Sequence, residues 1–238
     1  MQITVVLPTY NEAENLPRLV SALFVLPLDL RILVVDDNSP DGTGDIAEAL
    51  KERYPGRVDV LHRPRKAGLG PAYLAGFQQA LQTQPDAIAQ MDSDFSHPVE
   101  ALPQMAAQLE AGADVVLGSR YVPGGKLDER WPLWRKALST FGNFYARSIL
   151  RIPVRDVTGG YRLWRSTALA QLPLQRVRAN GYVFQVEMAY LAHKKGLRMV
   201  EIPIYFTERR WGQSKMSFRI QVEAALGVWE LLWRYRDL

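Results

Sequence analysis

Short apolar runs alternate with segments of helical periodicity through the first half of the chain. The apolar runs at residues 3–7, 31–35, 58–61, 87–91 and 115–117 predict buried strands. The segments between them predict helices at 16–23, 44–54, 72–81 and 98–110, and Asn11 with Glu14 matches a capping box before the first of these. Strands that alternate with helices form parallel βαβ units. We therefore predict an α/β fold with a mostly parallel central sheet and helices on both faces.

The second half of the chain has a less regular pattern. Periodicity predicts helices at 133–150, 182–194 and 216–236 and a short strand at 199–202, while residues 122–131 and 156–161 carry loop and turn residues. Internal repeats and low-complexity linkers are absent from the sequence. We expect one large domain over residues 1–215, followed by an amphipathic C-terminal helix over residues 216–238.

The composition restricts the classes of protein to which this chain can belong. The 238 residues include no cysteine, which excludes disulfides and thiolate metal sites. Neither a signal peptide nor a run of about 18 uncharged apolar residues is visible, so we expect a cytoplasmic protein without a membrane span.

The net charge of +4 is mild, but the basic residues gather in two zones. One zone covers residues 118–165 and the other residues 209–236, which suggests anionic ligands or an anionic surface. Trp229, Trp233 and Arg234 in the last helix resemble the aromatic and basic mix of helices at a membrane interface. Docking of this helix on the domain or on a partner explains the same pattern equally well.

Polar residues follow several of the predicted strands directly. Because ligands bind at the carboxyl ends of strands in parallel sheets, residues 9–12, 36–41, 92–97 and 118–121 should share one rim. Asp92-Ser93-Asp94 offers two carboxylates for a divalent cation that keeps positions open for diphosphate oxygens. The triplet is a weak signal by itself, and its place after a buried strand strengthens it.

Several motifs occur together in a particular order. They read Val-Val-Leu-Pro-Thr-Tyr-Asn-Glu from Val5, Val-Val-Asp-Asp-Asn-Ser-Pro-Asp-Gly-Thr from Val34, Lys-Ala-Gly-Leu-Gly from Lys66, Met-Asp-Ser-Asp-Phe-Ser-His-Pro from Met91, Gly-Ser-Arg-Tyr from Gly118, Asp-Val-Thr-Gly-Gly-Tyr-Arg from Asp156 and Gly-Gln-Ser-Lys from Gly212. The ordered set resembles the inverting family-2 glycosyltransferases with the GT-A fold, and among them the dolichol-phosphate (polyprenol-phosphate) mannose synthases. The resemblance extends from Val5 to about Met216.

The resemblance implies a role for each of a set of residues. Asp92 and Asp94 would bind Mg²⁺ or Mn²⁺, and Asp92, Asp94, Arg120 and Asp156 would be catalytic. The donor nucleotide would contact Pro8, Tyr10, Glu12, Asp37, Lys66, Gly68, Arg209 and Lys215, and the lipid phosphate would contact Arg120, Arg135 and Ser139. The implied substrates are GDP-mannose and a polyprenyl or dolichyl phosphate.

Physical reasoning supports a phosphate acceptor separately. A phosphate monoester has a second pKa of about 6 and is already largely dianionic near neutral pH, so it needs cationic positioning rather than a base. Arg120 and Arg135 offer planar bidentate donors for such a group. Attack opposite the leaving diphosphate inverts the anomeric centre and turns an α-linked donor into a β-linked product.

For four further residues, the sequence allows a structural role beside a functional one. Ser96 stands where some relatives carry a glutamine that contacts the metal, and its shorter side chain makes it a doubtful ligand. His97, before Pro98, is better explained by structure than by ligation. Asp156 either orients the acceptor or the sugar, or it serves structure by capping or by pairing with Arg162. Glu187 faces either the site or a neighbouring arginine.

Two other functions remain as alternatives. One is a polyprenyl-phosphate glucosyltransferase that uses UDP-glucose, and the other is a non-catalytic nucleotide-sugar binding protein. A dinucleotide dehydrogenase is disfavoured because the first strand leads into Pro-Thr-Tyr-Asn rather than G-x-G-x-x-G. We expect peripheral attachment to the inner face of the cell membrane, directly or through a membrane-anchoring protein partner, and no nucleic-acid partner.

Overall fold

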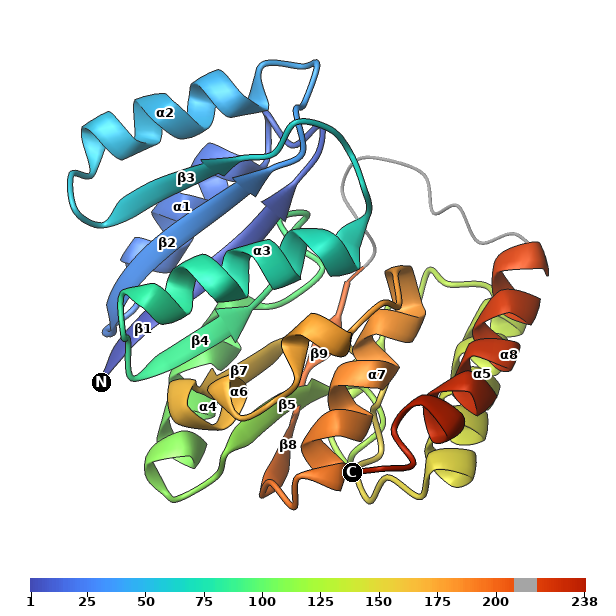
Figure 1. Cartoon of the computed structure of the whole chain (residues 1–238). Helices are drawn as coiled ribbons and strands as arrows, with labels where there is room; N and C mark the ends of the chain where they lie inside the picture. The colour runs from blue at the N-terminus through green and yellow to red at the C-terminus, as the bar shows by residue number, and fades with distance from the viewer. Residues whose placement is uncertain (208–217) are drawn as a thin grey trace.

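The computed structural model describes residues 1–207 and 218–238, except for the side chains of residues 218–224. The described strands are β1 (Gln2–Thr9), β2 (Asp29–Asp36), β3 (Val58–His62), β4 (Ala87–Gln90), β5 (Val115–Ser119), β6 (Lys126–Leu127), β7 (Arg162–Arg165), β8 (Met199–Pro203) and β9 (Tyr205–Phe206). Seven of them form one sheet in the order β3-β2-β1-β4-β7-β5-β8, and β6 pairs with β9 in a second, smaller sheet (Figure 1).

Helices cover both faces of the large sheet (Figure 1). They are α1 (Leu16–Phe24), α2 (Thr43–Arg53), α3 (Leu69–Gln82), α4 (Leu102–Glu110), α5 (Leu133–Leu150), α6 (Ser166–Ala170), α7 (Gly181–Lys194) and α8 (Phe218–Arg234), with 3₁₀ turns at Val99–Ala101 and Leu174–Arg176. In β1, Val5 belongs to the core beneath α1, α2 and α4, whereas Val6 belongs to the core beneath α3, α5 and α7. This alternation is the period of two that strand geometry imposes, and it confirms the predicted α/β sandwich.

Strand β7 corrects the prediction for the second half of the chain. The turn-rich segment at 156–161 leads into Arg162–Arg165, which pairs antiparallel with β4 on one side and β5 on the other. The remaining pairs of the large sheet are parallel, so the sheet is mostly parallel as predicted. A four-residue strand with arginine at both ends has no apolar run, which explains why the hydrophobic pattern missed it.

The predicted capping box at Asn11 is wrong. Helix α1 begins at Leu16 with Asn15 as its N-cap, and Asn11 has a positive φ of 63°. The backbone of Asn11 donates to Ser39 Oγ at 3.1 Å, and that of Glu12 donates to Thr43 Oγ1 at 2.9 Å. These contacts with the loop after β2 and with the first residue of α2 compete with local capping and delay the start of the helix.

Helix α8 docks on the domain by one stripe of its surface. Val228, Leu231 and Tyr235 are buried against the core that includes α5 and α7. Leu226, Trp229 and Trp233 lie on the exposed side, so Trp229 is not on the buried stripe. Among the described helices, none combines the length and the apolar character that crossing a bilayer requires.

Sheet topology determines where a ligand can bind. From β1 the chain adds β2 and β3 on one side, and β4 then pairs with β1 on its other side. Such a switch point leaves a crevice at the carboxyl ends of the two central strands. The segments that follow β1, β2 and β4 therefore meet at one rim.

Candidate functional site

The loop after β4 holds Asp92 in a defined position. Tyr73 of α3 donates its hydroxyl hydrogen to Asp92 Oδ1 at 2.8 Å, and the backbone of Asp92 donates to His97 Nδ1 at 3.1 Å. Burial and then the charge of Asp92 raise the pKa of Tyr73 well above its ordinary value, so the phenol stays a hydrogen-bond donor. His97 also stacks on Tyr161, which supports the structural interpretation of this histidine.

Asp94 lies two residues further along the same loop and is buried. Its Oδ1 accepts a hydrogen bond from the backbone of Ser96 at 3.0 Å. Ser96 Oγ is buried and has no hydrogen-bond partner among the described residues. Carboxylate oxygens are the hard donors that Mg²⁺ and Mn²⁺ prefer, and substrate phosphates commonly complete a shell begun by one or two carboxylates. The donor set of Asp92 and Asp94 therefore fits such a cation.

The opposite part of the rim surrounds Asp37, which follows β2. Arg63 Nη1 lies 2.5 Å from Asp37 Oδ1, and the backbone of Ala67 donates to Asp37 Oδ2 at 3.3 Å. The ammonium group of Lys66 lies 3.6 Å from the centroid of the Tyr10 ring. The segments after β1, β2 and β3 thus form one continuous wall, and Lys66, Tyr10 and Asp37 belong to it.

Pro8 and Glu12 border the same rim. The Pro8 carbonyl accepts a hydrogen bond from Ser93 Oγ at 2.9 Å, which ties the end of β1 to the Asp92–Asp94 loop. Glu12 Oε2 accepts from Asn15 Nδ2 at 2.8 Å. Gly68 has a φ of 102°, a conformation that favours glycine, and it precedes α3.

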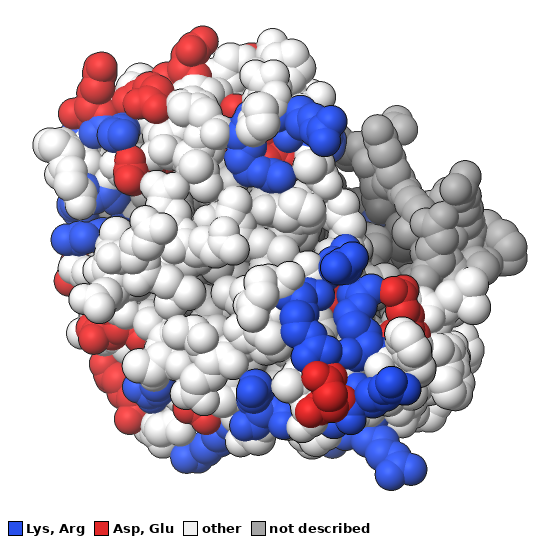
Figure 2. Space-filling view, viewed as in Figure 1, with Lys and Arg blue, Asp and Glu red and all other residues white. Residues whose placement is uncertain are grey.

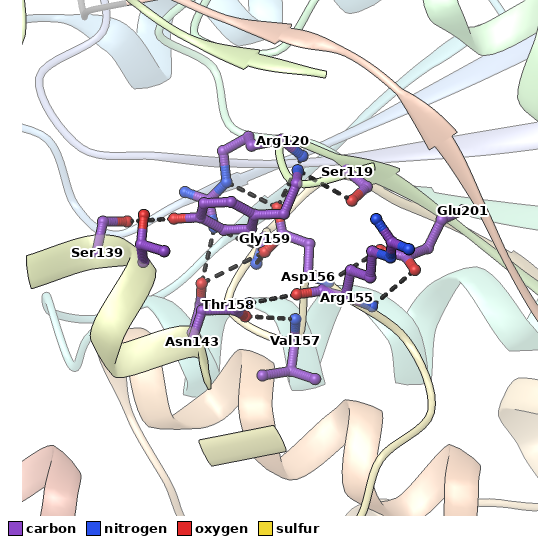
Figure 3. Close-up of polar contacts among 12 residues, drawn as sticks. Ser119, Arg120, Ser139, Asn143, Arg155, Asp156, Val157, Thr158, Gly159 and Glu201 are labelled. Atoms are coloured by element: carbon purple, nitrogen blue, oxygen red, sulfur yellow. Dashed lines mark hydrogen bonds and ion pairs between the residues drawn. The ribbon is translucent and has the colours of Figure 1, made fainter. Parts of the chain in front are cut away.

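A buried ion pair dominates the other side of the site (Figure 3). Arg120 Nε and Nη2 donate to the two carboxylate oxygens of Asp156, each at 2.8 Å, and Nη2 also donates to Thr158 Oγ1 at 2.7 Å. Burial would lower the pKa of Arg120, but the charge and hydrogen bonds of Asp156 outweigh it and raise that pKa. For Asp156, burial acts to raise the pKa, yet Arg120 lowers it. Both side chains are therefore charged.

Asp156 is itself held from two other elements (Figure 3). The backbone of Asp156 donates to Glu201 Oε1 of β8 at 2.8 Å, and the backbone of Val157 donates to Asn143 Oδ1 of α5, also at 2.8 Å. Of the structural alternatives for Asp156, local capping is found, since the backbone of Gly159 donates to Asp156 Oδ1 at 2.9 Å. A hydrogen-bonded pair with Arg162 is not found, because Arg162 donates to the carbonyls of Gly159, Val157 and Gln185. Burial lowers the pKa of Arg162 to about 10.

The first turns of α5 bring Ser139 and Arg135 to the same side. Ser139 Oγ and the Tyr121 hydroxyl form a hydrogen bond at 2.8 Å, and Tyr121 follows Arg120 directly. Arg135 stacks over the Trp131 ring at 3.7 Å from its centroid. Ser139 thus contacts the residue after Arg120, whereas Arg135 contacts Trp131, whose ring lies beside Phe206.

Phe206 of β9 connects the two sides of the site. Its ring lies 5.6 Å from the His97 ring and 5.9 Å from the Trp131 ring, and Arg120 Cζ lies 5.3 Å from its centroid. A methyl group placed on Gly160 would lie 3.7 Å from Asp92 Oδ2, so the Asp156 loop also approaches the Asp92 carboxylate. The Asp92 carboxylate and the Arg120 guanidinium therefore lie on two sides of the same space, which the Phe206 ring borders.

Sequence reasoning missed several residues of this arrangement. Tyr73, Arg63, Asn143 and Glu201 hold candidate site residues, but each lies inside a predicted helix, strand or loop without any motif of its own. Arg209 and Lys215, both predicted to contact the donor, lie outside the described residues. Glu187, left open between two roles, pairs with Arg234 at 2.7 Å.

Known proteins resemble this chain over nearly its whole length. The model of the family described as Glycosyl transferase family 2 matches residues 4–172. A polyprenol monophosphomannose synthase of Mycolicibacterium smegmatis is 46% identical over 213 residues, which cover 90% of this chain and 80% of that protein. An undecaprenyl-phosphate mannosyltransferase of Micrococcus luteus is 43% identical over 240 residues, covering 100% of this chain and 98% of that protein.

Solved structures share the fold at low sequence identity. A glucosyl-3-phosphoglycerate synthase of Mycobacterium tuberculosis, in complex with Mn²⁺, UDP and phosphoglyceric acid, superposes with a TM-score of 0.69 at 17% identity over 98% of this chain and 78% of that chain. A mannosyl-3-phosphoglycerate synthase of Rubrobacter xylanophilus gives a TM-score of 0.68 at 17% identity over 100% and 75%. The sheet topology, the family match and the close relatives together show that this chain belongs to glycosyl transferase family 2 and is a glycosyltransferase with the GT-A fold.

Proposed function

We propose that the chain is a polyprenyl-phosphate mannosyltransferase that transfers mannose from GDP-mannose to a polyprenyl monophosphate. The observation that carries this proposal is the meeting of the Asp92–Asp94 loop with the charged Arg120–Asp156 pair around Phe206. Two relatives above 40% identity are named for mannose transfer to polyprenyl lipids, which supports the sugar and the acceptor class. UDP-glucose is the alternative donor that the experiment below distinguishes.

The acceptor needs placement rather than deprotonation. Its phosphate is largely dianionic near neutral pH, since the second pKa is about 6. Asp156 holds Arg120 in one orientation and keeps it charged, so the guanidinium can attract the phosphate without being free to rotate. Ser139 and Arg135 extend this acceptor side along α5.

The bond changes follow from this placement. An acceptor phosphate oxygen attacks the anomeric carbon, the bond from that carbon to the diphosphate breaks, and the diphosphate leaves with the electron pair. The configuration inverts and the product is β-linked. A bound Mg²⁺ or Mn²⁺ at Asp92 and Asp94 would supply positive charge to the departing diphosphate. Asp37, Tyr10 and the Lys66 loop would hold the nucleotide on the opposite wall, with Pro8, Glu12 and Gly68 beside them.

An exposed apolar surface supports attachment to a bilayer. Helices α5 and α8 lie side by side (Figure 1), and Tyr145 donates to the Ala225 carbonyl at 3.2 Å across them. The large exposed apolar side chains of the two helices are Leu133, Trp134, Phe141, Phe144, Leu226, Trp229 and Trp233, and together we call them the aromatic surface. Isolated exposed apolar residues are ordinary, but a group of this size on adjacent helices marks an interaction site.

The chemistry of the surroundings favours lipid as the occupant. Arg236 Cζ lies 5.1 Å from the Trp233 ring centroid, and mixed tryptophan and arginine side chains are typical of helices at a bilayer interface. Figure 2 shows Lys and Arg side chains gathered where α7 and the C-terminus lie in Figure 1. We propose that the chain binds peripherally to the inner face of the cell membrane through the aromatic surface, and that any anchoring protein partner would bind the same surface.

The direct test is a transfer assay with purified protein. GDP-mannose or UDP-glucose is mixed with Mn²⁺ and a short-chain polyprenyl phosphate, and the lipid product is detected by mass spectrometry. We expect transfer from GDP-mannose and a β-anomeric signal in the NMR spectrum of the product. Transfer from UDP-glucose alone would reject the mannose assignment. Nucleotide binding without transfer from either donor would contradict the proposed donor and acceptor.

A further inference from the structure

A fully buried carboxylate outside the site joins the end of α8 to the backbone before α7. Glu187 Oε1 accepts hydrogen bonds from the Tyr235 hydroxyl at 2.8 Å and from Arg234 Nη1 at 2.7 Å. Its other oxygen, Oε2, accepts from the backbone of Ala179 at 2.9 Å and of Arg178 at 3.3 Å. An ionised group in the interior is costly unless it is satisfied in this way. The position of residues 178–179 therefore depends on the contacts of Glu187 with Arg234 and Tyr235 at the C-terminal end of α8.

Asn180, which follows Ala179, forms hydrogen bonds with the loop that precedes α3 and with the first turn of α3. Its Oδ1 accepts from the backbone of Gly70 at 3.2 Å, and its Nδ2 donates to the Ala67 carbonyl at 3.0 Å. A Cβ added to Gly68 would lie 2.0 Å from Asn180 Nδ2, and one added to Gly70 would lie 2.4 Å from the Ala179 carbonyl oxygen. The loop at residues 66–70 thus packs closely against residues 179–180, and the glycines at 68 and 70 permit this close approach.

The same loop forms part of the donor wall. Lys66 stacks on Tyr10, and the backbone of Ala67 donates to Asp37. Each link from the last helix to this wall is a direct contact: Tyr235 and Arg234 bind Glu187, Glu187 binds residues 178–179, and Asn180 binds residues 67–70. None of these residues belongs to the acceptor side described above.

We propose that Glu187 and Asn180 are positioning residues through which α8 sets the loop at residues 66–70 and thereby the affinity for the nucleotide. The proposal rests on the donor wall of the proposed function. It gives α8 a second task in addition to carrying part of the aromatic surface. Donor binding should consequently respond to the Tyr235 contact even where no lipid is present.

Two matched tyrosine variants of the full-length chain test the proposal without removing a charge. Tyr235→Phe deletes the hydroxyl that binds Glu187, whereas Tyr145→Phe deletes the hydroxyl that joins α8 to α5. Asn180→Ala removes the last link directly. The measurements are backbone hydrogen exchange of residues 66–72 and calorimetric titration with GDP and Mn²⁺, both without lipid. One lost hydrogen bond of about 1 kcal/mol corresponds to about fivefold in affinity.

We expect Tyr235→Phe and Asn180→Ala to speed exchange at residues 66–72 and to weaken GDP binding about three- to tenfold, while Tyr145→Phe changes neither. Unchanged exchange in both test variants would overturn the proposal, as would an equal effect of Tyr145→Phe. Faster exchange with unaltered GDP affinity would also overturn it, because the loop would then lie outside the nucleotide site. A wild-type protein that binds no GDP would instead remove the donor assignment on which the proposal rests.

Discussion

The proposed donor side and the proposed acceptor side of the site are built from different kinds of contact. Asp37 directly follows β2, and Asp92 follows β4 after one residue, so the sheet itself brings them to one rim. Arg120 directly follows β5, and its partner Asp156, 36 residues further on, lies in a loop that Glu201 of β8 and Asn143 of α5 hold in place. The proposed donor side therefore combines carboxylates at strand ends with a loop at residues 66–70 held by Asn180, whereas the proposed acceptor side depends on one buried pair.

The largest effect should come from the donor side. Asp94→Ala is expected to lower kcat about a thousandfold or more, because removing a carboxylate that binds the cation costs several kcal/mol of transition-state stabilisation. Mannose transfer to a short polyprenyl phosphate measures this. Asp86→Ala alters a carboxylate at the other end of β4 and should retain activity. Near-normal turnover in Asp94→Ala would refute the assignment of the cation site.

Breaking the buried pair should damage the fold of the acceptor side. Asp156→Ala leaves Arg120 buried without its carboxylate, which should cost about 3–5 kcal/mol in the free energy of unfolding. The double variant Arg120→Met with Asp156→Met should recover at least half of that loss and remain inactive. Urea unfolding followed by tryptophan fluorescence gives both values. Recovery of activity in the double variant would contradict the role of Arg120.

The same pair should affect the response to acid. The pKa of Asp156 is lowered in the folded state, so its contribution to stability is present above its unfolded pKa of about 3.9 and is lost as pH falls through the folded pKa. The wild type should therefore lose more stability below about pH 4 than the Arg120→Met and Asp156→Met double variant. Urea unfolding between pH 6 and pH 3 compares the slopes, and parallel slopes would count against the ionised pair.

Membrane attachment belongs to the acceptor side and should respond to the aromatic surface. Replacing Trp229 and Trp233 together by serine should weaken binding to anionic vesicles at least about tenfold, because the two exposed indoles provide apolar area for the interface. Vesicle flotation measures the effect. Activity with a soluble short-chain acceptor should change little. Equal flotation of variant and wild type would remove the aromatic surface from the proposal.

The smallest effect should be that of Ser139→Ala. It removes the hydrogen bond with Tyr121, whose net worth is about 1 kcal/mol, so the KM for the lipid phosphate should rise about fivefold while the KM for the donor stays constant. Steady-state kinetics with each substrate varied separately tests this. A change confined to the KM for the donor would contradict the placement of Ser139 on the acceptor side.

The hydrophobic pattern and the motifs by themselves determined the α/β class, the parallel core and the rim where polar residues gather. Strand and helix periodicities are local, and the carboxyl ends of parallel strands must share an edge, so these features can be deduced from one-dimensional order. Only the tertiary structure decided that Arg120 is the partner of Asp156, that β7 enters between β4 and β5, and that Tyr235 rather than Trp229 faces the domain. Contacts such as those between Asn180 and Gly70, 110 residues apart, arise from packing of whole elements and leave no periodic signal in the chain.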